Sequence, residues 1–306
     1  MQRLRLPATI MAASASLLAA TPAFAGEDAA SGPPGARTEG EAEAGIAGED
    51  AMADKGGDRL RDLTTDRPDI AESPYTVDPG HIQIETTLIG YTRSRRDPAG
   101  VATDSYEFAT SNLRIGLTDR LELDLVWQPY GIVDPRRGGA PARGIGSVTI
   151  RAKYNLWGND GPSQPGDTAL GLLPYVTLPT DADNGVSERE VSFGLIVPVA
   201  LELGGGFALG MNAGANFTRE DARDRFDASV LAVASLGFAW TERLGSYAEV
   251  AWEFSRGGPD GGDVVTLDTG LTFRIAENWQ LDAGINVGVT RAADPIAPFI
   301  GFAARF

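Results

Sequence analysis

The stretch WQLDAGINVGVT, residues 279–290, alternates between apolar residues and polar or small residues along its whole length. Successive side chains of a β-strand point to opposite faces, whereas a helix would scatter these two kinds of residue around its axis. The stretch therefore predicts a strand with one apolar face and one polar face. The same alternation occurs in LELDLVWQ at 121–128 and in DVVTLDTGLTFR at 263–274.

Segments of this kind repeat from His81 to Phe306, and each is about 10–13 residues long. Strands of globular sheets average ~5–6 residues, whereas a tilted strand that crosses a bilayer needs ~9–11. No apolar run after the first 25 residues reaches the ~18 that a membrane-spanning helix requires. Twelve strands are predicted, at 81–92, 105–117, 120–129, 145–156, 167–178, 190–202, 206–217, 227–239, 244–254, 263–274, 279–290 and 297–306.

The connections between these segments also alternate in length. Thr118-Asp119, LGGG, WTER and AEN are tight turns, and most others, such as PYGIVDPRRGGAPARG at 129–144, are longer loops. The exception is WGNDGPSQPG at 157–166, which is long for the tight-turn end. Tight turns at the periplasmic end and loops at the other end are typical of outer-membrane barrels. We therefore expect an all-β fold, a 12-stranded antiparallel up-and-down transmembrane β-barrel over residues 81–306.

A water-soluble sandwich would show the same period and is the alternative fold. Its apolar face would point inward, and so many long strands would leave unpaired edges that need protection. Aromatic residues near the strand ends, as the girdles at membrane interfaces require, instead favour a barrel with its apolar face toward lipid. These residues are Trp127, Trp157, Phe207, Phe217, Trp240, Phe254 and Trp279. Pro174 and Pro198 fall inside predicted strands, so we expect a bulge or a gap in the pairing there.

The residues before the barrel divide into three parts. Residues 1–25 contain Arg3, Arg5, a short apolar run and Ala23-Phe24-Ala25, which predict a secretory signal peptide cleaved after Ala25. Residues 26–63 are rich in Ala, Gly, Glu and Asp and predict an acidic disordered segment. Residues 64–80 form a separate motif before the first strand.

The net charge is −16 for the whole chain and −18 without the two leader arginines, which argues against nucleic acid as a partner.

The polar face of the predicted strands carries charges of both signs. Polar side chains along a lumen let water and solutes pass. A barrel of ~8 strands is filled by its side chains and one of ~16–18 holds an open channel, so an intermediate number predicts a narrow or partly occluded pore. The charges could equally form ion pairs that close the lumen. The predicted lumen-lining residues are Arg114, Glu122, Asp124, Arg151, Lys153, Glu249, Glu253, Asp268, Arg274 and Asp282.

The stretch TTDRPDIAESPYTVDPGHIQIE, residues 64–85, leads into the first strand without a period of its own. It resembles the opening of an outer-membrane transporter family named for a MetA pathway of phenol degradation. The likeness lies in Thr65-Asp66-Arg67-Pro68-Asp69, Glu72-Ser73-Pro74-Tyr75-Thr76-Val77, Pro79-Gly80-His81 and Gln83-Ile84-Glu85. LLPYVTLPT at 172–180 and PVALELGGGFALG at 198–210 resemble the middle strands of that family. The resemblance implies a twelve-stranded channel or transporter for small solutes, including small aromatic or hydrophobic compounds.

Two interpretations of residues 64–80 remain open. Asp66, Arg67, Asp69 and Glu72 are expected at the periplasmic mouth, beside the polar lumen. The prolines of the segment restrict its backbone, so ordering it costs less entropy. The segment either tucks into the mouth as a plug or serves as a plain leader to the first strand.

Other classes of function are less well supported. An outer-membrane phospholipase needs a serine activated by a histidine, and the one histidine, His81, lies at the predicted periplasmic start of the first strand. With no cysteine and one histidine, we expect no catalytic residue, no metal site and no cofactor. The main alternative to a channel is a non-transporting structural or surface-interaction barrel with residues 26–63 as its short cargo.

Arginines cluster in two of the predicted outer loops, against the acidic balance of the chain. Arginine binds phosphate through paired hydrogen bonds, and the phosphates of lipopolysaccharide lie at this level of an outer membrane. The cluster predicts contact with lipopolysaccharide, with ordinary loop solvation as the alternative. Its members are Arg93, Arg95, Arg96, Arg136, Arg137 and Arg143. We thus expect the outer membrane of a Gram-negative bacterium, with lipid and small solutes as partners.

Overall fold

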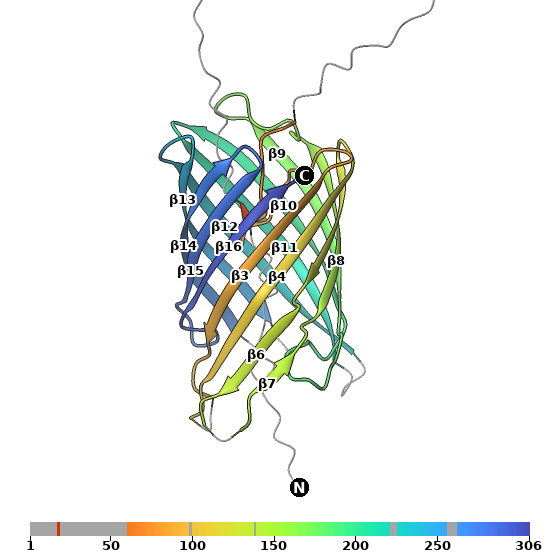
Figure 1. Cartoon of the computed structure of the whole chain (residues 1–306), viewed down its shortest axis with the longest axis vertical. Coiled ribbons are helices and arrows are strands. Elements are labelled where there is room, and N and C mark those ends of the chain that lie inside the picture. The colour runs from red at the N-terminus through yellow and green to blue at the C-terminus, as the bar shows by residue number, and fades with distance from the viewer. Residues whose placement is uncertain (1–16, 19–59, 98–99, 138, 221–224, 256–261) are drawn as a thin grey trace, which may run out of the picture. The chain divides into compact units, whose positions relative to one another are not determined.

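A closed 12-stranded antiparallel β-barrel forms the body of the protein in the computed structural model (Figure 1). The structure describes residues 17–18, 60–97, 100–137, 139–220, 225–255 and 262–306. The predicted acidic segment 26–63 lies outside the described residues up to residue 59, and so does the predicted signal peptide apart from Leu17–Leu18. No helix in these described ranges is long and apolar enough to cross a membrane.

In the described part of the chain, the wall is one continuous sheet of fourteen strands, of which twelve form the closed ring and two short ones, β6 and β7, extend it. Its strands are β3 (Ile82–Arg93), β4 (Thr103–Thr118), β5 (Leu121–Trp127), β6 (Tyr130–Pro135), β7 (Ala142–Gly144), β8 (Val148–Trp157), β9 (Thr168–Leu178), β10 (Ser192–Gly204), β11 (Phe207–Glu220), β12 (Arg225–Ala239), β13 (Leu244–Ser255), β14 (Gly262–Ala276), β15 (Trp279–Gly288) and β16 (Ala297–Arg305). Strand β16 pairs with β3 and β3 with β4, which closes the sheet. The predicted fold class is therefore confirmed.

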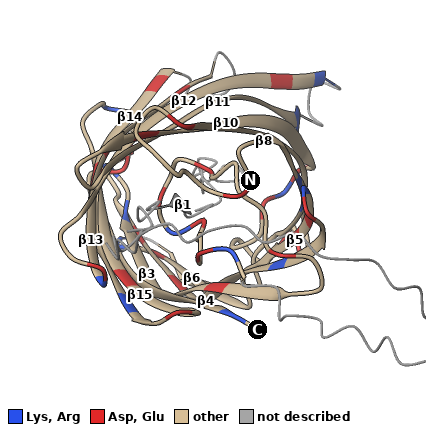
Figure 2. Ribbon diagram, turned by 90° about the horizontal axis from the view of Figure 1, so that it is seen from above, with Lys and Arg blue, Asp and Glu red and all other residues tan. Residues whose placement is uncertain are grey.

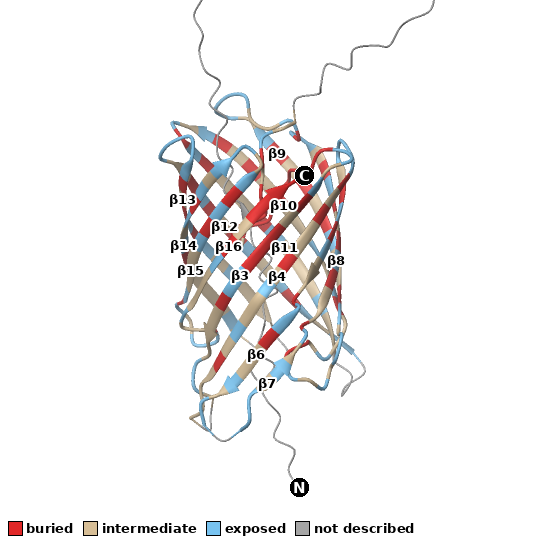
Figure 3. Cartoon of the chain, viewed as in Figure 1, coloured by how far each residue is buried: buried red, intermediate tan, exposed pale blue. Residues whose placement is uncertain are grey.

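The exposure of the side chains shows which face of the sheet is turned outward. In β15, Trp279 and Leu281 are 43% and 44% exposed, whereas the alternate Gln280 and Asp282 are 3% and 6% exposed. Buried and exposed residues alternate in this way around the wall (Figure 3). A protein that folds in water would bury the apolar set instead, so this arrangement is that of a barrel whose outer surface faces lipid.

Each proline inside a strand interrupts the pairing on one side and stays in register on the other, Pro174 with Leu195 and Pro198 with Asn212. Between β8 and β9 the register passes from Arg151 with Tyr175 to Tyr154 with Leu172, which skips Pro174. Between β9 and β10 it passes from Ile196 with Leu173 to Val199 with Leu170, which skips Pro198. Proline has no N–H to donate, so these gaps leave its nitrogen out of the ladder, as the sequence led us to expect.

The structure corrects the prediction of a loop at 129–144. This region forms β6 and β7, which pair with each other and extend the wall beyond β5 and β8. Strand β4 is 16 residues long, and its outer half pairs with β3 on one side and with β6 on the other. The prediction failed because Pro129 and the glycines and prolines of this stretch read as turn residues, whereas pairing to β4 overrides that local preference.

Candidate functional site in the barrel lumen

Residues 64–80, here named the lumen segment, enter the barrel and fold back within it. The segment begins and ends at the tight-turn end, where the Arg61 Nε lies 2.8 Å from the Asp78 Oδ1. Between these points it reaches the middle of the wall, where Ala71 packs against Val233 of β12. The view along the barrel shows chain inside the ring of strands (Figure 2). Within the segment, β2 (Pro68–Asp69) pairs with β1 (Leu17–Leu18), which belongs to the predicted signal peptide.

The wall holds the backbone of the lumen segment through side-chain oxygens. Glu249 accepts hydrogen bonds from the N–H groups of Ile70 and Ala71 at 2.8 and 2.9 Å. The other acceptors are Glu85 for Asp66 N at 2.9 Å, Glu122 for Val77 N at 2.6 Å, Asn159 for Thr76 N at 2.9 Å, and Asn212 for Glu72 N. Buried N–H groups outside a ladder need such partners. Acceptors from several sides of the barrel therefore hold the segment without covalent bonds.

A buried cluster of ion pairs joins the lumen segment to β4 and β8. The Asp66 carboxylate lies 2.6 Å from Lys153 Nζ, 3.3 Å from Arg114 and 3.7 Å from Arg151. Burial alone would raise the pKa of Asp66, but Arg114, Lys153 and Arg151 outweigh it and hold that pKa below its ordinary value. Glu72 lies 2.7 Å from Arg151, and burial raises the pKa of Glu72 to about 7 against that charge.

Arg67 attaches the segment to the wall at β15, which β3 and β16 separate from β4 of this cluster. Its guanidinium forms two hydrogen bonds to Asp282 of β15, at 2.8 and 3.1 Å, and lies 5.5 Å from the centre of the Phe299 ring. It also donates to the Thr87 hydroxyl. A side chain at Gly301 would overlap this guanidinium, so the bare backbone of β16 makes room for Arg67. Paired hydrogen bonds between arginine and carboxylate are among the strongest that side chains make.

The wall near Asp69 has a different electrostatic character. Asp69 accepts a hydrogen bond from the Ser235 hydroxyl and faces Glu249, which is paired with Asp268 across β13 and β14. Burial, and then the Glu249 carboxylate, raise the pKa of Asp69 well above its ordinary value. One side of the lumen is thus rich in ion pairs, and the other is acidic.

The structure places the predicted residues as follows. Most of the predicted lumen-lining residues are buried inside the barrel, whereas Glu253 and Arg274 are only partly buried. Asp66, Arg67, Asp69 and Glu72, expected at the mouth, contact inward-facing side chains of the strands, which are Lys153 of β8, Asp282 of β15, Ser235 of β12 and Asn212 of β11. The buried residues are Arg114, Glu122, Asp124, Arg151, Lys153, Glu249, Asp268 and Asp282.

Several contacts were missed by reasoning from sequence. Glu85 and Asn212 lie at alternate positions of their strands, so the period of two could have identified them as inward-facing. Arg305 lies 3.0 Å from Asp78 and fastens the end of the segment. Asn159 comes from the exceptionally long turn at 157–166 and hydrogen-bonds to Thr76, which explains the extra length of that turn.

The arginines of the predicted basic cluster divide into two sets. Arg93 and Arg136 lie 2.9 and 3.2 Å from Asp104, and Arg95 donates to the carbonyl groups of Gly288, Thr290 and Ala293. These three fasten neighbouring strands and loops. The remaining residues, Arg96, Arg137 and Arg143, are exposed.

Two features bear on catalysis and metal binding. His81 Nδ1 lies 3.2 Å from the Pro79 carbonyl oxygen at the start of β3. Carboxylate oxygens of Asp66, Glu122 and Asp124 lie within 4.8 Å of one another. These are the carboxylates that already face Arg114, Arg151 and Lys153, so their charge is compensated by the protein itself.

Comparisons with known proteins agree with this architecture. Residues 65–306 match the family model described as "Putative MetA-pathway of phenol degradation". The chain is similar to the COG4313 outer membrane channel from Pseudomonas putida F1, with 14% identity, 76% of this chain and 98% of that chain covered, and a TM-score of 0.56. The NanC porin has 7% identity, coverage of 73% and 98%, and a TM-score of 0.47. At such identities the likeness to the channel shows a shared fold. A comparison with curated proteins gave no match.

Proposed function

Because this chain belongs to the family described as "Putative MetA-pathway of phenol degradation", we propose that it is an outer-membrane channel for small solutes, gated by its lumen segment. The observation that carries the proposal is the seating of residues 64–80 inside a closed barrel by non-covalent contacts alone. A seated segment narrows the lumen, and a displaced segment would leave a passage lined by charged and polar side chains. Such a lumen suits the passage of hydrated solutes.

Export and processing form part of the same proposal. We propose that residues 1–25 are removed as a signal peptide and that the mature chain begins at Gly26. Strand β1 would then be absent from the mature protein, while the contacts of the lumen segment with the wall would remain. Sequencing the N-terminus of protein isolated from bacterial outer membranes would test this, and retention of residues 17–18 would contradict it.

Deleting the lumen segment is expected to enlarge the pore. A chain of residues 81–306 should give conductance steps several-fold larger than residues 26–306 in planar bilayers, because the deletion removes the peptide that fills the lumen. Heat-modifiable gel mobility serves as the control that both forms have folded into barrels. Equal steps from the two forms would contradict gating by the segment, and silence from both folded forms would contradict the channel itself.

For the solute, we propose small aromatic or hydrophobic compounds. The family description supports this choice, and so do the apolar side chains of Leu231, Val233 and Ala251, which the wall presents to the lumen where the seated segment packs on it. The same bilayers test it, since phenol in the bath should interrupt the ionic current of the 81–306 form. A sugar of similar size, added in the same way, is the control. If phenol and the sugar interrupt the ionic current equally, the preference for aromatic or hydrophobic solutes is contradicted.

We further propose that Arg96, Arg137 and Arg143 contact lipopolysaccharide phosphates. Each is exposed at the loop end of the barrel. The Arg137→Glu, Arg143→Glu double variant should retain less lipopolysaccharide after purification, because two phosphate-binding groups become repulsive. Arg189→Glu, on another exposed loop, is the matched control. Retention equal to that of the control would overturn this contact.

A further inference from the structure

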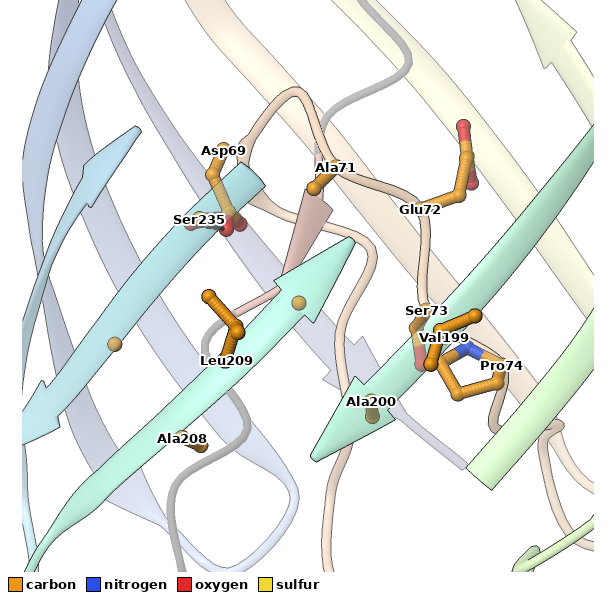
Figure 4. A pocket seen from close by; sticks show the side chains of 12 residues that line it. Asp69, Ala71, Glu72, Ser73, Pro74, Val199, Ala200, Ala208, Leu209 and Ser235 are labelled. Atoms are coloured by element: carbon orange, nitrogen blue, oxygen red, sulfur yellow. Dashed lines mark hydrogen bonds between the residues drawn. The ribbon is translucent and has the colours of Figure 1, made fainter. Parts of the chain in front are cut away.

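The lumen segment packs against different parts of the inner wall with different closeness. Gly210 and Gly237 line a small gap that remains beside β10, β11 and β12 (Figure 4). A Cβ atom added to either glycine would have no neighbour closer than 3.9 or 3.7 Å, respectively. One added to Gly270 of β14 or Gly284 of β15 would lie only 2.5 or 2.6 Å from its nearest neighbour. The lumen is therefore closely packed beside β14 and β15.

Two aromatic rings cover these closely packed glycines. Tyr247, Gly270, Gly284 and Phe299 are neighbours in register across β13, β14, β15 and β16. The Cβ position of Gly270 is 2.6 Å from Tyr247 Cε1, and that of Gly284 is 2.6 Å from Phe299 Cζ and 2.7 Å from the Tyr247 hydroxyl oxygen. Glycine inside a strand marks a place where another group approaches the backbone closely. Here it lets both rings lie against the wall, and we name Tyr247 and Phe299 the aromatic platform.

The lumen segment occupies the aromatic platform in its seated position. The Arg67 guanidinium lies over the Phe299 ring, 5.5 Å from the ring centre, while it donates two hydrogen bonds to Asp282. The carbonyl oxygen of the next residue, Pro68, lies 3.4 Å from the Tyr247 hydroxyl oxygen. Tyr247 is only 3% exposed and the Asp282 side chain is fully buried. Displacement of the segment would therefore uncover two aromatic rings and a carboxylate.

The contacts of Arg67 indicate which solute would take its place. Arg67 presents a planar group to the Phe299 ring and, within the same reach, N–H donors to Asp282. A small aromatic ring with a hydroxyl group has the same two features, a flat face and a donor. Aromatic rings gain free energy from pairing, and the Asp282 carboxylate would keep a hydrogen-bond partner. An aromatic carboxylate would instead be repelled by Asp282.

We propose that the aromatic platform, with Asp282 beside it, binds small hydroxylated aromatic compounds in the open channel. The inference rests on the proposed channel function and names the residues that recognise its solute. Arg67-Pro68 occupies the same site in the resting channel, so the solute and the lumen segment compete for it. A solute that binds only after the segment leaves shifts the channel toward its open state.

The first test measures how phenol interrupts the ionic current of the 81–306 form in planar bilayers, since this form lacks the lumen segment. Phe299→Leu keeps an apolar side chain but removes the ring. It should raise the phenol concentration that halves the current about two- to tenfold, which corresponds to the loss of one aromatic pair. Tyr175→Leu is the matched control, because Tyr175 is a tyrosine of β9 whose hydroxyl donates to Asn216, away from the platform. It should leave that concentration unchanged.

Cyclohexanol is the second probe, because it has about the size of phenol and the same hydroxyl group but no aromatic face. It should interrupt the current less than phenol does. Where heat-modifiable gel mobility shows that Phe299→Leu has not folded, Tyr247→Leu replaces it with the same expected increase. An unchanged phenol concentration in the folded leucine variant, or equal interruption by phenol and cyclohexanol, would overturn the platform.

Competition with the lumen segment is tested in the 26–306 form. Phenol should raise its open probability at concentrations at which cyclohexanol does not, and an open probability that phenol leaves unchanged would overturn the competition. Failure of the proposed function gives other results. Silence of the folded 81–306 form contradicts the channel, and equal interruption by phenol and a sugar contradicts the aromatic solute. Stronger interruption by phenol than by the sugar, unaltered by the leucine substitution, overturns the platform alone.

Discussion

A disulfide between Ala71→Cys and Gly210→Cys is expected to abolish the large openings of the channel, and reduction is expected to restore them. A Cβ atom at Gly210 would lie 3.9 Å from that of Ala71, within the ~3.5–4.5 Å that a disulfide requires. The chain has no cysteine of its own, so no other pairing competes. The bridge would fix the lumen segment to β11 in its seated position.

The measurement compares uptake of small solutes into liposomes by the oxidised and reduced forms of this double variant. Each single cysteine variant is a control and should respond to neither oxidant nor reductant. Solute uptake that is equal in the oxidised and reduced forms would show that the segment is not the gate.

Asp66→Asn is expected to open the channel by unseating the lumen segment. The substitution leaves Lys153, Arg114 and Arg151 in a buried site without the carboxylate that they share. Removing one partner of a buried ion pair costs about 3–5 kcal/mol, and the wall cations regain water once the segment leaves. A cost of about 3 kcal/mol corresponds to roughly a hundredfold shift toward the displaced state.

Open probability in planar bilayers measures this shift. The control is Asp119→Asn, an exposed aspartate in the turn between β4 and β5, which removes an equal charge without touching the cluster. If refolded Asp66→Asn has the same open probability as that control, the ion pairs of Asp66 contribute nothing to holding the lumen segment in the barrel.

The barrel itself follows from residues close together in the sequence. The period of two in stretches such as 279–290 identifies the strands, their lengths exceed those of globular sheets, and the alternation of turns and loops orders them. Odd and even positions along a strand also point to opposite faces, so Gln280 and Asp282 face inward whereas Trp279 and Leu281 face outward. These properties are local, because a strand exposes its two faces whatever it pairs with.

Contacts inside the lumen depend instead on closure of the sheet. Arg67 meets Asp282, which is 215 residues away, and no local pattern predicts that partner. The lumen segment shows no regular alternation of apolar and polar residues. Its sequence therefore does not specify how deeply it enters the barrel or which wall residues it contacts. For this reason the sequence was equally compatible with a plug and with a plain leader to the first strand. Likewise, a loop was predicted at 129–144, but β6 forms there by pairing with β4, and β7 forms by pairing with β6.

The sequence by itself thus determined a twelve-stranded membrane barrel with an apolar exterior and a charged interior, since alternation is a property of each strand alone. Only the tertiary structure decided that Asp66 lies among three cations, that Asp69 lies on the acidic side, and that a gap remains beside Gly210 and Gly237. These features arise where strands far apart in the chain enclose a segment, and the width and stagger of the closed sheet set the distances between them.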